Sequence, residues 1–289
     1  MTQQVYAVAG ATGTQGGAVA RALLADGRPV RALTRRPASP AAAELRRLGA
    51  DVVHADFADR PSLDAALAGA TALFAVTTPF GTDVRQEVRD GVALLDAAAA
   101  TGTVEHIVFT SVTNADRDTG VPHFDSKHRI ERHLATLGVP WTVIAPAAFM
   151  DQYAESWTRE GLREGTFARP MPGDRPLALI AAADIGAFAA HVLARPATFA
   201  GRRIDIASDE RTGHEIAAVL SHACGHEIAY RELPMEHIEA YSPDLAAMFR
   251  HFTTVGLDVD IPSLRRDHPE ITWHTLETWA TTHTWDLQP

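Results

Sequence analysis

The chain has 289 residues, of which 46% are hydrophobic and 21% charged, and this composition is typical of a globular protein with a large core. Asp and Glu (36) outnumber Lys and Arg (26), and the net charge of −10 argues against direct nucleic-acid binding. No apolar run approaches the roughly 20 residues of a membrane-spanning helix, and the N-terminal residues do not resemble a secretory leader. A single cysteine, Cys224, excludes an internal disulfide, so we expect a cytoplasmic protein without membrane contact.

The first half of the chain alternates short β-branched runs with helical stretches. Helix signals separate the runs; for example, Ser39-Pro40 opens a segment that stops at Gly49. Because the runs are apolar on both faces, they suit a buried parallel sheet, and the alternation predicts a Rossmann-type doubly wound α/β domain over residues 1–150. The predicted strands are residues 5–9, 30–34, 51–54, 72–77, 106–111 and 141–146.

Beyond residue 150 the alternation becomes irregular. A predicted helix at 182–193 and a strand at 203–207 indicate that residues 176–208 return to the Rossmann domain. Residues 151–175 and 209–289 are predicted to form a smaller, mostly helical lobe that closes over the sheet and holds a substrate or a partner. Within this lobe the pattern predicts helices at 215–223, 235–254 and 273–283 and a short strand at 228–233.

The first chemical motif is Gly10-Ala11-Thr12-Gly13-Thr14-Gln15-Gly16-Gly17, directly after the first strand and before an amphipathic helix. Glycines at this spacing allow a tight turn and bring backbone amides close to a pyrophosphate, which then lies at the positive end of the helix. The motif therefore predicts a dinucleotide site. Its Gly-x-x-Gly-x-x-Gly spacing matches extended and atypical short-chain dehydrogenases.

The end of the second strand predicts which dinucleotide binds. Proteins that prefer NAD carry an acidic residue there for the ribose 2′-hydroxyl, whereas this chain has Arg35 and Arg36 and no carboxylate. A guanidinium binds a 2′-phosphate through two charge-assisted hydrogen bonds. We therefore predict NADP(H) as the cofactor, with Arg35 on the 2′-phosphate; the alternative is a pair of solvated arginines.

Two further segments follow strands and are assigned by position. Asp56 and Phe57 come after the third strand, where such folds hold the adenine, although a turn or capping role for Asp56 stays open. Thr77 and Thr78 come after the fourth strand and are expected to line the ligand crevice.

A helix predicted from His123 onward carries the residues that bear on function. Lys127 precedes Ile130 by three residues and therefore lies on the apolar face of the helix. Its positive charge in the first turn opposes the helix dipole, and its burial on this face carries a free-energy cost of desolvation. Ribose hydroxyls of a bound nicotinamide nucleotide would offset both costs; the alternative is a lysine that reaches solvent. His123 lies four residues before Lys127, at the position where reductases of the short-chain dehydrogenase superfamily carry a tyrosine. It could be a general acid, or it could only pack or cap the helix.

Together these segments resemble the NmrA-like family of atypical short-chain dehydrogenase/reductases. The resemblance is carried by the glycine motif, His123-Phe124-Asp125-Ser126-Lys127, residues 137–142 and 182–186, and Asp244-Leu245-Ala246-Ala247-Met248-Phe249-Arg250. It implies a cofactor site in which Lys127 holds the nicotinamide ribose and Arg35 holds the 2′-phosphate. The pyrophosphate would be held by Gly10, Thr12, Gly13, Gln15 and Gly16, and Thr14 would also contact the cofactor. The missing tyrosine puts ordinary alcohol dehydrogenation in doubt.

Two hypotheses of function remain from the sequence. In the first, which we favour, the protein is an NADPH-dependent oxidoreductase that reduces a quinone or another small apolar carbonyl compound, with His123 and Lys127 at the reaction centre. Phe149, Met150, Tyr153 and Trp157 could line its pocket or pack within the lobe. In the second, the protein is a redox sensor whose NADP(H)-dependent conformation is recognised by a regulatory protein partner. No metal site is expected, and the sequence does not predict the oligomeric state.

Overall fold

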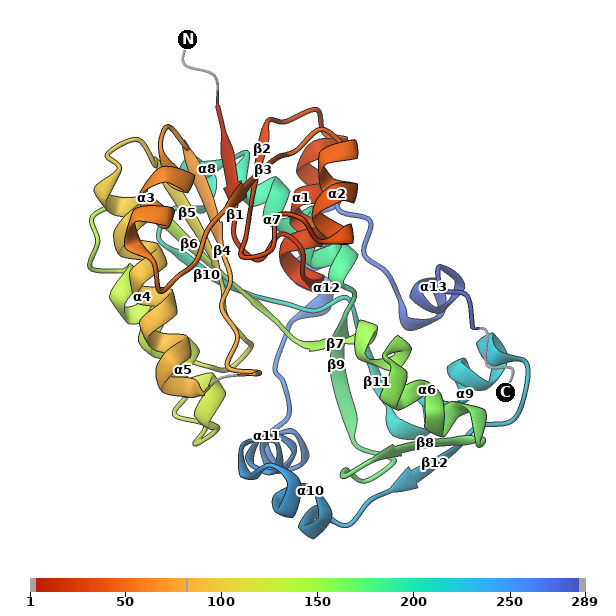
Figure 1. The fold of residues 1–289 in the computed structure, drawn as a ribbon. Helices are drawn as coiled ribbons and strands as arrows, with labels where there is room; N and C mark the ends of the chain where they lie inside the picture. Colours follow the sequence, from red (N-terminus) through yellow and green to blue (C-terminus); the bar gives the residue numbers. More distant parts are fainter. Residues whose placement is uncertain (1–3, 82, 286–289) are drawn as a thin grey trace.

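The computed structural model describes residues 4–81 and 83–285, and its centre is a seven-stranded parallel sheet in the order β10-β6-β5-β4-β1-β2-β3 (Figure 1). The six strands predicted in the first half are all present, and the strand predicted at 203–207 forms the seventh. The sheet strands are β1 (Tyr6–Val8), β2 (Val30–Thr34), β3 (Asp51–His54), β4 (Ala72–Ala75), β5 (His106–Thr110), β6 (Trp141–Pro146) and β10 (Arg202–Ile206). The predicted Rossmann-type fold is confirmed.

Helices cover both faces of this sheet, which explains why its strands are apolar on both sides. One face packs against α1, α2, α7 and α8, where Leu23 and Phe188 are fully buried; the other packs against α3, α4 and α5, where Leu94 and Ile130 are fully buried. These helices are α1 (Thr14–Ala25), α2 (Pro40–Arg47), α3 (Arg60–Leu67), α4 (Val84–Ala100), α5 (Pro122–Leu134), α7 (Ala182–Leu193) and α8 (Pro196–Phe199).

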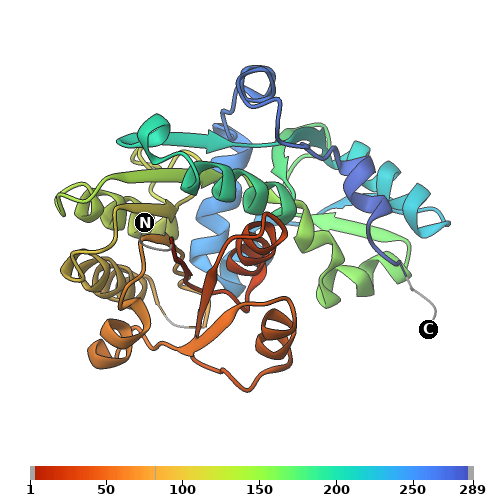
Figure 2. The ribbon, with the colours of Figure 1, turned by 90° about the horizontal axis from the view of Figure 1, so that it is seen from above.

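The strand order reverses between β1 and β4, and this switch point positions the site. From β1 the chain first adds β2 and β3 on one side and then β4, β5, β6 and β10 on the other. Because the loops that leave β1 and β4 diverge there, open α/β sheets hold ligands in this crevice, outside the carboxyl ends of the strands. The smaller lobe lies at the same end of the sheet (Figures 1 and 2).

Two short sheets and several helices form the smaller lobe. Its three-stranded sheet has the order β11-β9-β7, and a two-stranded sheet pairs β12 with β8. β9 therefore belongs to the lobe by pairing, whereas α7 and β10 return to the main sheet; the domain division at residues 150, 175 and 208 stays a prediction. The elements of the lobe are β7 (Ala148–Phe149), η1 (Met150–Ala154), α6 (Ser156–Arg163), β8 (Thr166–Arg169), β9 (Pro176–Ile180), β11 (Asp209–Thr212), α9 (Gly213–Cys224), β12 (Ala229–Glu232), α10 (Met235–Tyr241), α11 (Pro243–Thr254) and α13 (Leu276–Thr281). The helix α12 (Ile261–Asp267), which the sequence placed in the lobe, packs through Leu264 against the core of the main sheet.

Two predicted helices of the lobe differ from the structure. The helix expected at 235–254 is two helices, α10 and α11, because Pro243 lacks an amide hydrogen and its ring excludes a continuous helix; Ser242 instead caps α11 through the Leu245 amide. The helix expected at 273–283 begins only at Leu276, after the capping residue Thr275. No helix in the described part of the chain has both the length and the apolar character needed to cross a membrane.

Candidate active site

One cavity of about 690 Å³ extends from the switch point of the main sheet into the smaller lobe. Its size suits a cofactor or a small substrate. Every residue that the sequence assigned to catalysis or cofactor binding lines this cavity, although these residues come from five separate segments of the chain: Gly10, Thr12, Gly13, Thr14, Gln15, Gly16, Arg35, Asp56, Phe57, Thr77, Thr78, His123 and Lys127.

The glycine turn has the geometry of a phosphate cradle. Gly10 has a φ of +59°, which favours glycine, and a Cβ on Gly16 would lie 2.4 Å from the Gly10 carbonyl oxygen. Side chains at either position would therefore push the turn apart. α1 follows directly, with Gly13 at its N-cap, no side-chain cap and no acidic residue in its first turn. The amides at its N-terminus are thus open to an anion in the cavity.

Arg35 and Arg36 lie exposed at the carboxyl end of β2 and form no ion pair within the described residues. Beneath them the Thr34 hydroxyl accepts a hydrogen bond from the Arg36 amide at 3.1 Å and contacts the Thr12 hydroxyl at 3.3 Å. The second strand and the glycine turn are therefore joined at this point. Two unpaired guanidinium groups beside an uncapped helix fit the 2′-phosphate and pyrophosphate of NADP(H).

The two segments assigned by position differ in what they contact. The Asp56 carboxylate accepts a hydrogen bond from the Ala58 amide at 3.0 Å, so the turn role is observed, while the adenine role of Asp56 and Phe57 stays a prediction. Thr77 is buried and Thr78 is exposed. The Thr77 hydroxyl donates to Glu87 at 3.2 Å, which links the end of β4 to α4.

Lys127 is buried, so the alternative of a lysine that reaches solvent is wrong. Its Nζ lies 3.0 Å from Glu87 Oε1 and donates to the Thr77 carbonyl oxygen at 2.5 Å. Burial lowers the pKa of Lys127, although Glu87 and Glu131 act to raise it. Glu87 therefore compensates the buried charge of Lys127 from within the protein, without ribose hydroxyls, and the ribose role of Lys127 stays a prediction.

Sequence reasoning missed Glu87, although a signal for it was present. Glu87 lies on the same buried face of α4 as Gly91 and Leu94, and Gly91 packs against Ile130 of α5. A carboxylate on a buried face requires a cationic or hydrogen-bonding partner. Ser126 supplies a second partner, because its hydroxyl donates to Glu87 Oε2.

His123 forms a pair with Asp244, which comes from the first turn of α11 in the smaller lobe. His123 Nδ1 lies 2.8 Å from Asp244 Oδ1, and the His123 amide donates to the same oxygen at 3.2 Å. Since a carboxylate only accepts, Nδ1 carries the proton and Nε2 is the nitrogen left for a ligand. Burial tends to raise the pKa of Asp244, but its hydrogen bonds and charge interaction with His123 outweigh this, so the pKa lies below its usual value.

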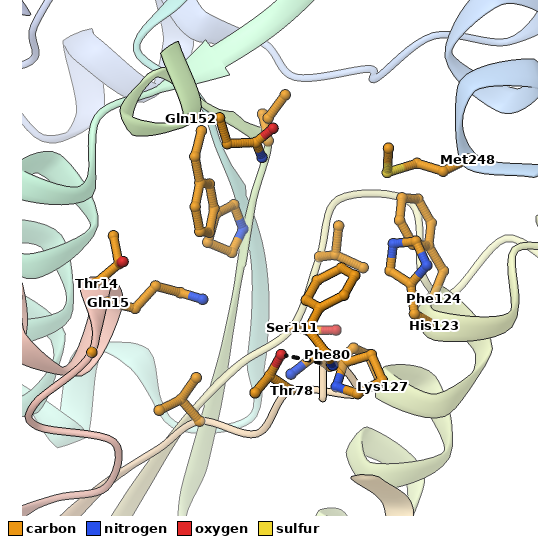
Figure 3. Close-up of a pocket in the computed structure, with 18 of the residues that line it drawn as sticks. Thr14, Gln15, Thr78, Phe80, Ser111, His123, Phe124, Lys127, Gln152 and Met248 are labelled. Carbon is orange, nitrogen blue, oxygen red and sulfur yellow. Dashed lines mark hydrogen bonds between the residues drawn. The ribbon is translucent and has the colours of Figure 1, made fainter. Parts of the chain in front are cut away.

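Figure 3 shows how these groups face one another. Thr14 and Gln15 lie on one side of the cavity, with His123 and Lys127 across from them. His123 also packs edge-on against Phe124, with ring centroids 4.8 Å apart, so its packing role is observed together with its position on the cavity wall. A role as general acid stays a prediction.

The lobe half of the cavity is mostly apolar. Phe149 and Tyr153 line it as expected, whereas Met150 is buried in the core of the lobe and Trp157 is exposed outside the lining. Further apolar lining comes from Met171, Leu177, Ile216, Met248, Phe249, Phe252 and Leu257.

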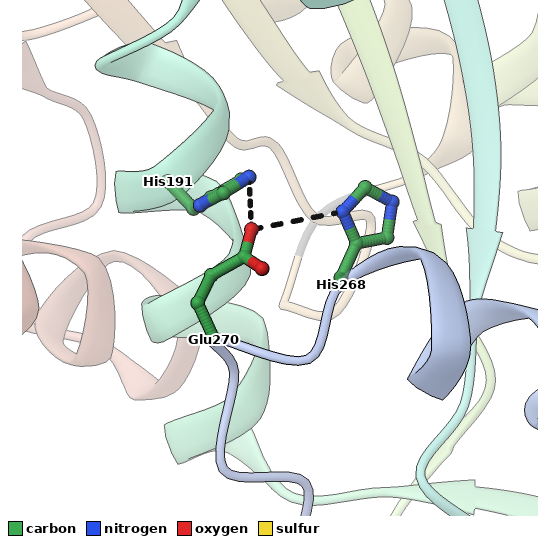
Figure 4. A group of neighbouring side chains, drawn as sticks. All are labelled: His191, His268 and Glu270. Carbon is green, nitrogen blue, oxygen red and sulfur yellow. Dashed lines mark ion pairs between the residues drawn. The ribbon is translucent and has the colours of Figure 1, made fainter.

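A second cluster of titratable groups lies outside this cavity lining. His191, His268 and Glu270 place ligand atoms within 4.8 Å of one another (Figure 4). However, Arg195 donates to His191 Nδ1 at 2.7 Å, so Nε2 carries the proton and donates to Glu270 Oε1 at 2.7 Å. This imidazole already has both nitrogens in use, and the absence of a metal site stays a prediction.

A glycine-rich phosphate cradle at the switch point of a parallel sheet defines an NAD(P)-binding Rossmann-type protein. The model of the NmrA-like family matches residues 2–280, and the chain belongs to this family. A (4-alkanoyl-5-oxo-2,5-dihydrofuran-3-yl)methyl phosphate reductase from Streptomyces griseus is 33% identical over 249 residues, covering 84% of this chain and 83% of that protein. The predicted family is confirmed.

Two solved structures are similar over nearly the whole chain. The NADPH-dependent quinone oxidoreductase QOR2 of Escherichia coli, in complex with NADPH, is 27% identical with a TM-score of 0.80, covering 96% of this chain and 99% of that chain. NmrA, a negative transcriptional regulator in complex with NADP, is 21% identical with a TM-score of 0.79, covering 97% and 95% of the two chains. The latter likeness shows the fold alone. The predicted cofactor class, NADP(H), is the one in both complexes.

Proposed function

We propose that this protein is an NADPH-dependent reductase of small, conjugated, electron-poor compounds such as quinones. The observation that carries the proposal is the single cavity that joins the glycine turn, the His123–Lys127 wall and the apolar lobe. A cofactor held by the turn and a substrate held by the lobe would share this cavity. Similar proteins are named as reductases of a quinone and of an unsaturated furanone phosphate.

The residues present fit NADP(H). The Gly10–Gly16 cradle would hold the pyrophosphate, Arg35 and Arg36 the 2′-phosphate, and Lys127 the nicotinamide ribose. When bound, the cofactor supplies a hydride. The remaining task of the protein is to orient the acceptor and exclude water, and the apolar lining of the lobe would perform it.

The reduced acceptor needs a proton, and His123 is placed to provide it. With Nδ1 held by Asp244, a protonated His123 would donate from Nε2 to the oxygen of the acceptor, and Asp244 would stabilise the imidazolium. This arrangement would do the proton transfer that a tyrosine does in other reductases. A quinone needs the acid least, because its reduced oxyanion is comparatively stable.

The test is NADPH consumption with a panel of quinones and enones. We expect enzyme-dependent loss of NADPH absorbance with at least one class. No consumption above background, with NADPH affinity intact, would overturn the proposal and favour the sensor hypothesis, in which a regulatory protein partner recognises the NADP(H)-bound conformation.

We further propose a cytoplasmic location. Cys224 is partly buried, and burial raises the pKa of its thiol to about 11, so the only cysteine of the chain is held as an unreactive thiol. This chemistry fits a reducing compartment. Fractionation of cells that express the protein would test the location.

A further inference from the structure

The lobe half of the cavity has a charge opposite to that of the chain. Among the lining residues from 146 to 257, the charged side chains are Arg169, Arg175 and Arg211, and none is acidic. The chain as a whole carries 36 acidic residues against 26 basic ones. A cavity with apolar walls and one sign of charge concentrates ligands of the opposite sign.

Arg169 is the least compensated of these arginines. It has no ion pair within the described residues, and burial lowers its pKa. Its guanidinium lies 4.5 Å from the ring centroid of Phe167 and 4.9 Å from that of Trp157. These rings stabilise the cation without neutralising it.

The guanidinium of Arg169 also keeps hydrogen-bond donors free. It donates to the Ala168 carbonyl oxygen at 2.8 Å and to the Thr158 hydroxyl at 3.5 Å. Five N–H groups are present, so those two bonds leave donors for a ligand oxyanion. The cost of burying an unpaired cation would then be offset when the cavity is occupied.

Arg175 adds a second such group, whereas Arg211 does not. Arg175 is partly buried, donates only to the Phe252 carbonyl oxygen at 3.3 Å, and forms no ion pair within the described residues. Arg211 is neutralised by Asp209 and Glu277, each at 3.1 Å. Two uncompensated cations therefore remain in the lobe half of the cavity.

We propose that Arg169 and Arg175 bind an acidic group, a carboxylate, sulfonate or phosphate, on an otherwise apolar substrate. The apolar part would occupy the surface formed by Phe149, Met171 and Phe252. The proposal rests on the proposed function in that the bound molecule would be the acceptor of the reductase. The anion site itself is testable without turnover.

The experiment measures binding to the protein saturated with NADP⁺, which occupies the cofactor phosphate positions. Calorimetry would compare 1-naphthyl phosphate, naphthalene-1-sulfonate and neutral 1-naphthol on the parent protein and on Arg169→Gln and Arg175→Gln. Arg163→Gln is the matched control, because Arg163 is exposed and outside the cavity lining. Arg169→Lys tests whether the charge alone is sufficient.

We expect the parent to bind at least one anion more tightly than 1-naphthol. Each glutamine variant should weaken the binding of that anion by roughly tenfold, with little effect on the binding of 1-naphthol. Arg169→Lys should retain part of the preference for the anion over 1-naphthol. Equal affinity of the parent for charged and neutral probes would overturn the proposal. So would variants that lose the same factor of affinity for the charged and the neutral probes. If Arg169→Gln loses NADPH binding through misfolding, Arg175→Gln decides.

A turnover arm separates this proposal from the reductase proposal. The ratio of kcat/KM for a sulfonated naphthoquinone to that for its neutral parent should fall roughly tenfold in Arg175→Gln and stay constant in Arg163→Gln. A parent protein that binds the anions but reduces neither quinones nor enones would contradict the reductase and leave the anion site standing. Reduction of both quinones with an unchanged ratio would contradict the anion site alone.

Discussion

The Nζ of Lys127 and the Oε1 of Glu87 lie 3.0 Å apart in the wall of the cavity, and Glu87 is fully buried. This ion pair joins α5 to α4 beside the carboxyl end of β4. A buried pair of this kind depends on both partners, because removal of one leaves an uncompensated charge in a medium of low dielectric constant. The lysine is thus positioned by the protein before any ligand arrives.

Glu87→Gln should therefore destabilise the fold. We expect the free energy of unfolding in urea at pH 7 to fall by about 3 kcal/mol, because Lys127 remains buried without its counter-charge. Asp64→Asn is the matched control: Asp64 pairs with Arg60 on the surface, and a loss below about 1 kcal/mol is expected.

A double variant checks the cause of this loss. Glu87→Leu combined with Lys127→Met removes both charges and should restore most of the stability. If Glu87→Gln is as stable as the parent, or if the double variant loses more than the single one, the ion pair is not what holds this wall together.

The His123–Asp244 pair predicts a loss of turnover without a loss of cofactor binding. His123→Ala should lower kcat by roughly 10²-fold with enones and by less with quinones, whose reduced forms need the acid least. Asp244→Asn should lower kcat in the same direction by a smaller factor, since Asp244 acts through His123. Stopped-flow kinetics and NADPH titration would measure both effects.

Asp258→Asn provides the control for this pair, because Asp258 carries an exposed carboxylate that contacts Arg117 at 3.3 Å. It should leave kcat unchanged. Normal turnover in His123→Ala with both acceptor classes would return His123 to a packing role.

Arg35, which forms no ion pair within the described residues, predicts the cofactor preference. Arg35→Asp should weaken NADPH binding by about tenfold to a hundredfold, which corresponds to 1.5–3 kcal/mol for hydrogen bonds to a charged group, and should affect NADH little. Fluorescence titration with both cofactors would measure this. Arg47→Asp, at an exposed position on α2, is the charge-matched control, and an equal loss of NADPH and NADH would refute the assignment.

Stability should fall on mild acidification because of His106. Burial lowers the pKa of His106 from 6.5 to about 4, so the unfolded chain binds a proton between these values while the folded chain does not. The contribution of His106 to the free energy of unfolding, about 3 kcal/mol, is therefore present above pH 6.5 and is lost as the pH falls toward 4. Calorimetric melting of the parent and His106→Gln between pH 7 and 4 should show a smaller fall in the variant; parallel curves would contradict this.

The main sheet and the cofactor half of the cavity could be predicted because their signals are local. A strand of apolar residues followed by Gly10 to Gly16 indicates both a turn and the ligand that the turn binds. Arg35 follows the second strand directly, so its position at the end of that strand is evident from the sequence. All the positions predicted for the cofactor line one cavity.

The lobe could not be predicted as well, because its signals are weaker or depend on distant contacts. Pro243 marks the break between α10 and α11, yet the amphipathic pattern runs across it. Asp244 lies 121 residues from His123, and only the fold shows that they meet. The aromatic rings around Arg169 likewise come from separate segments.

The most direct measurement is a single-turnover reaction of the NADPH-loaded protein with a quinone under anaerobic conditions, run with NADPH and with NADPH deuterated at the transferred position. We expect one NADPH to be oxidised per quinone reduced and the deuterated cofactor to react more slowly, because the bond from carbon to the transferred hydrogen breaks in the step that is measured. Full NADPH binding without oxidation, for every acceptor tested, would contradict the reductase and favour the sensor hypothesis.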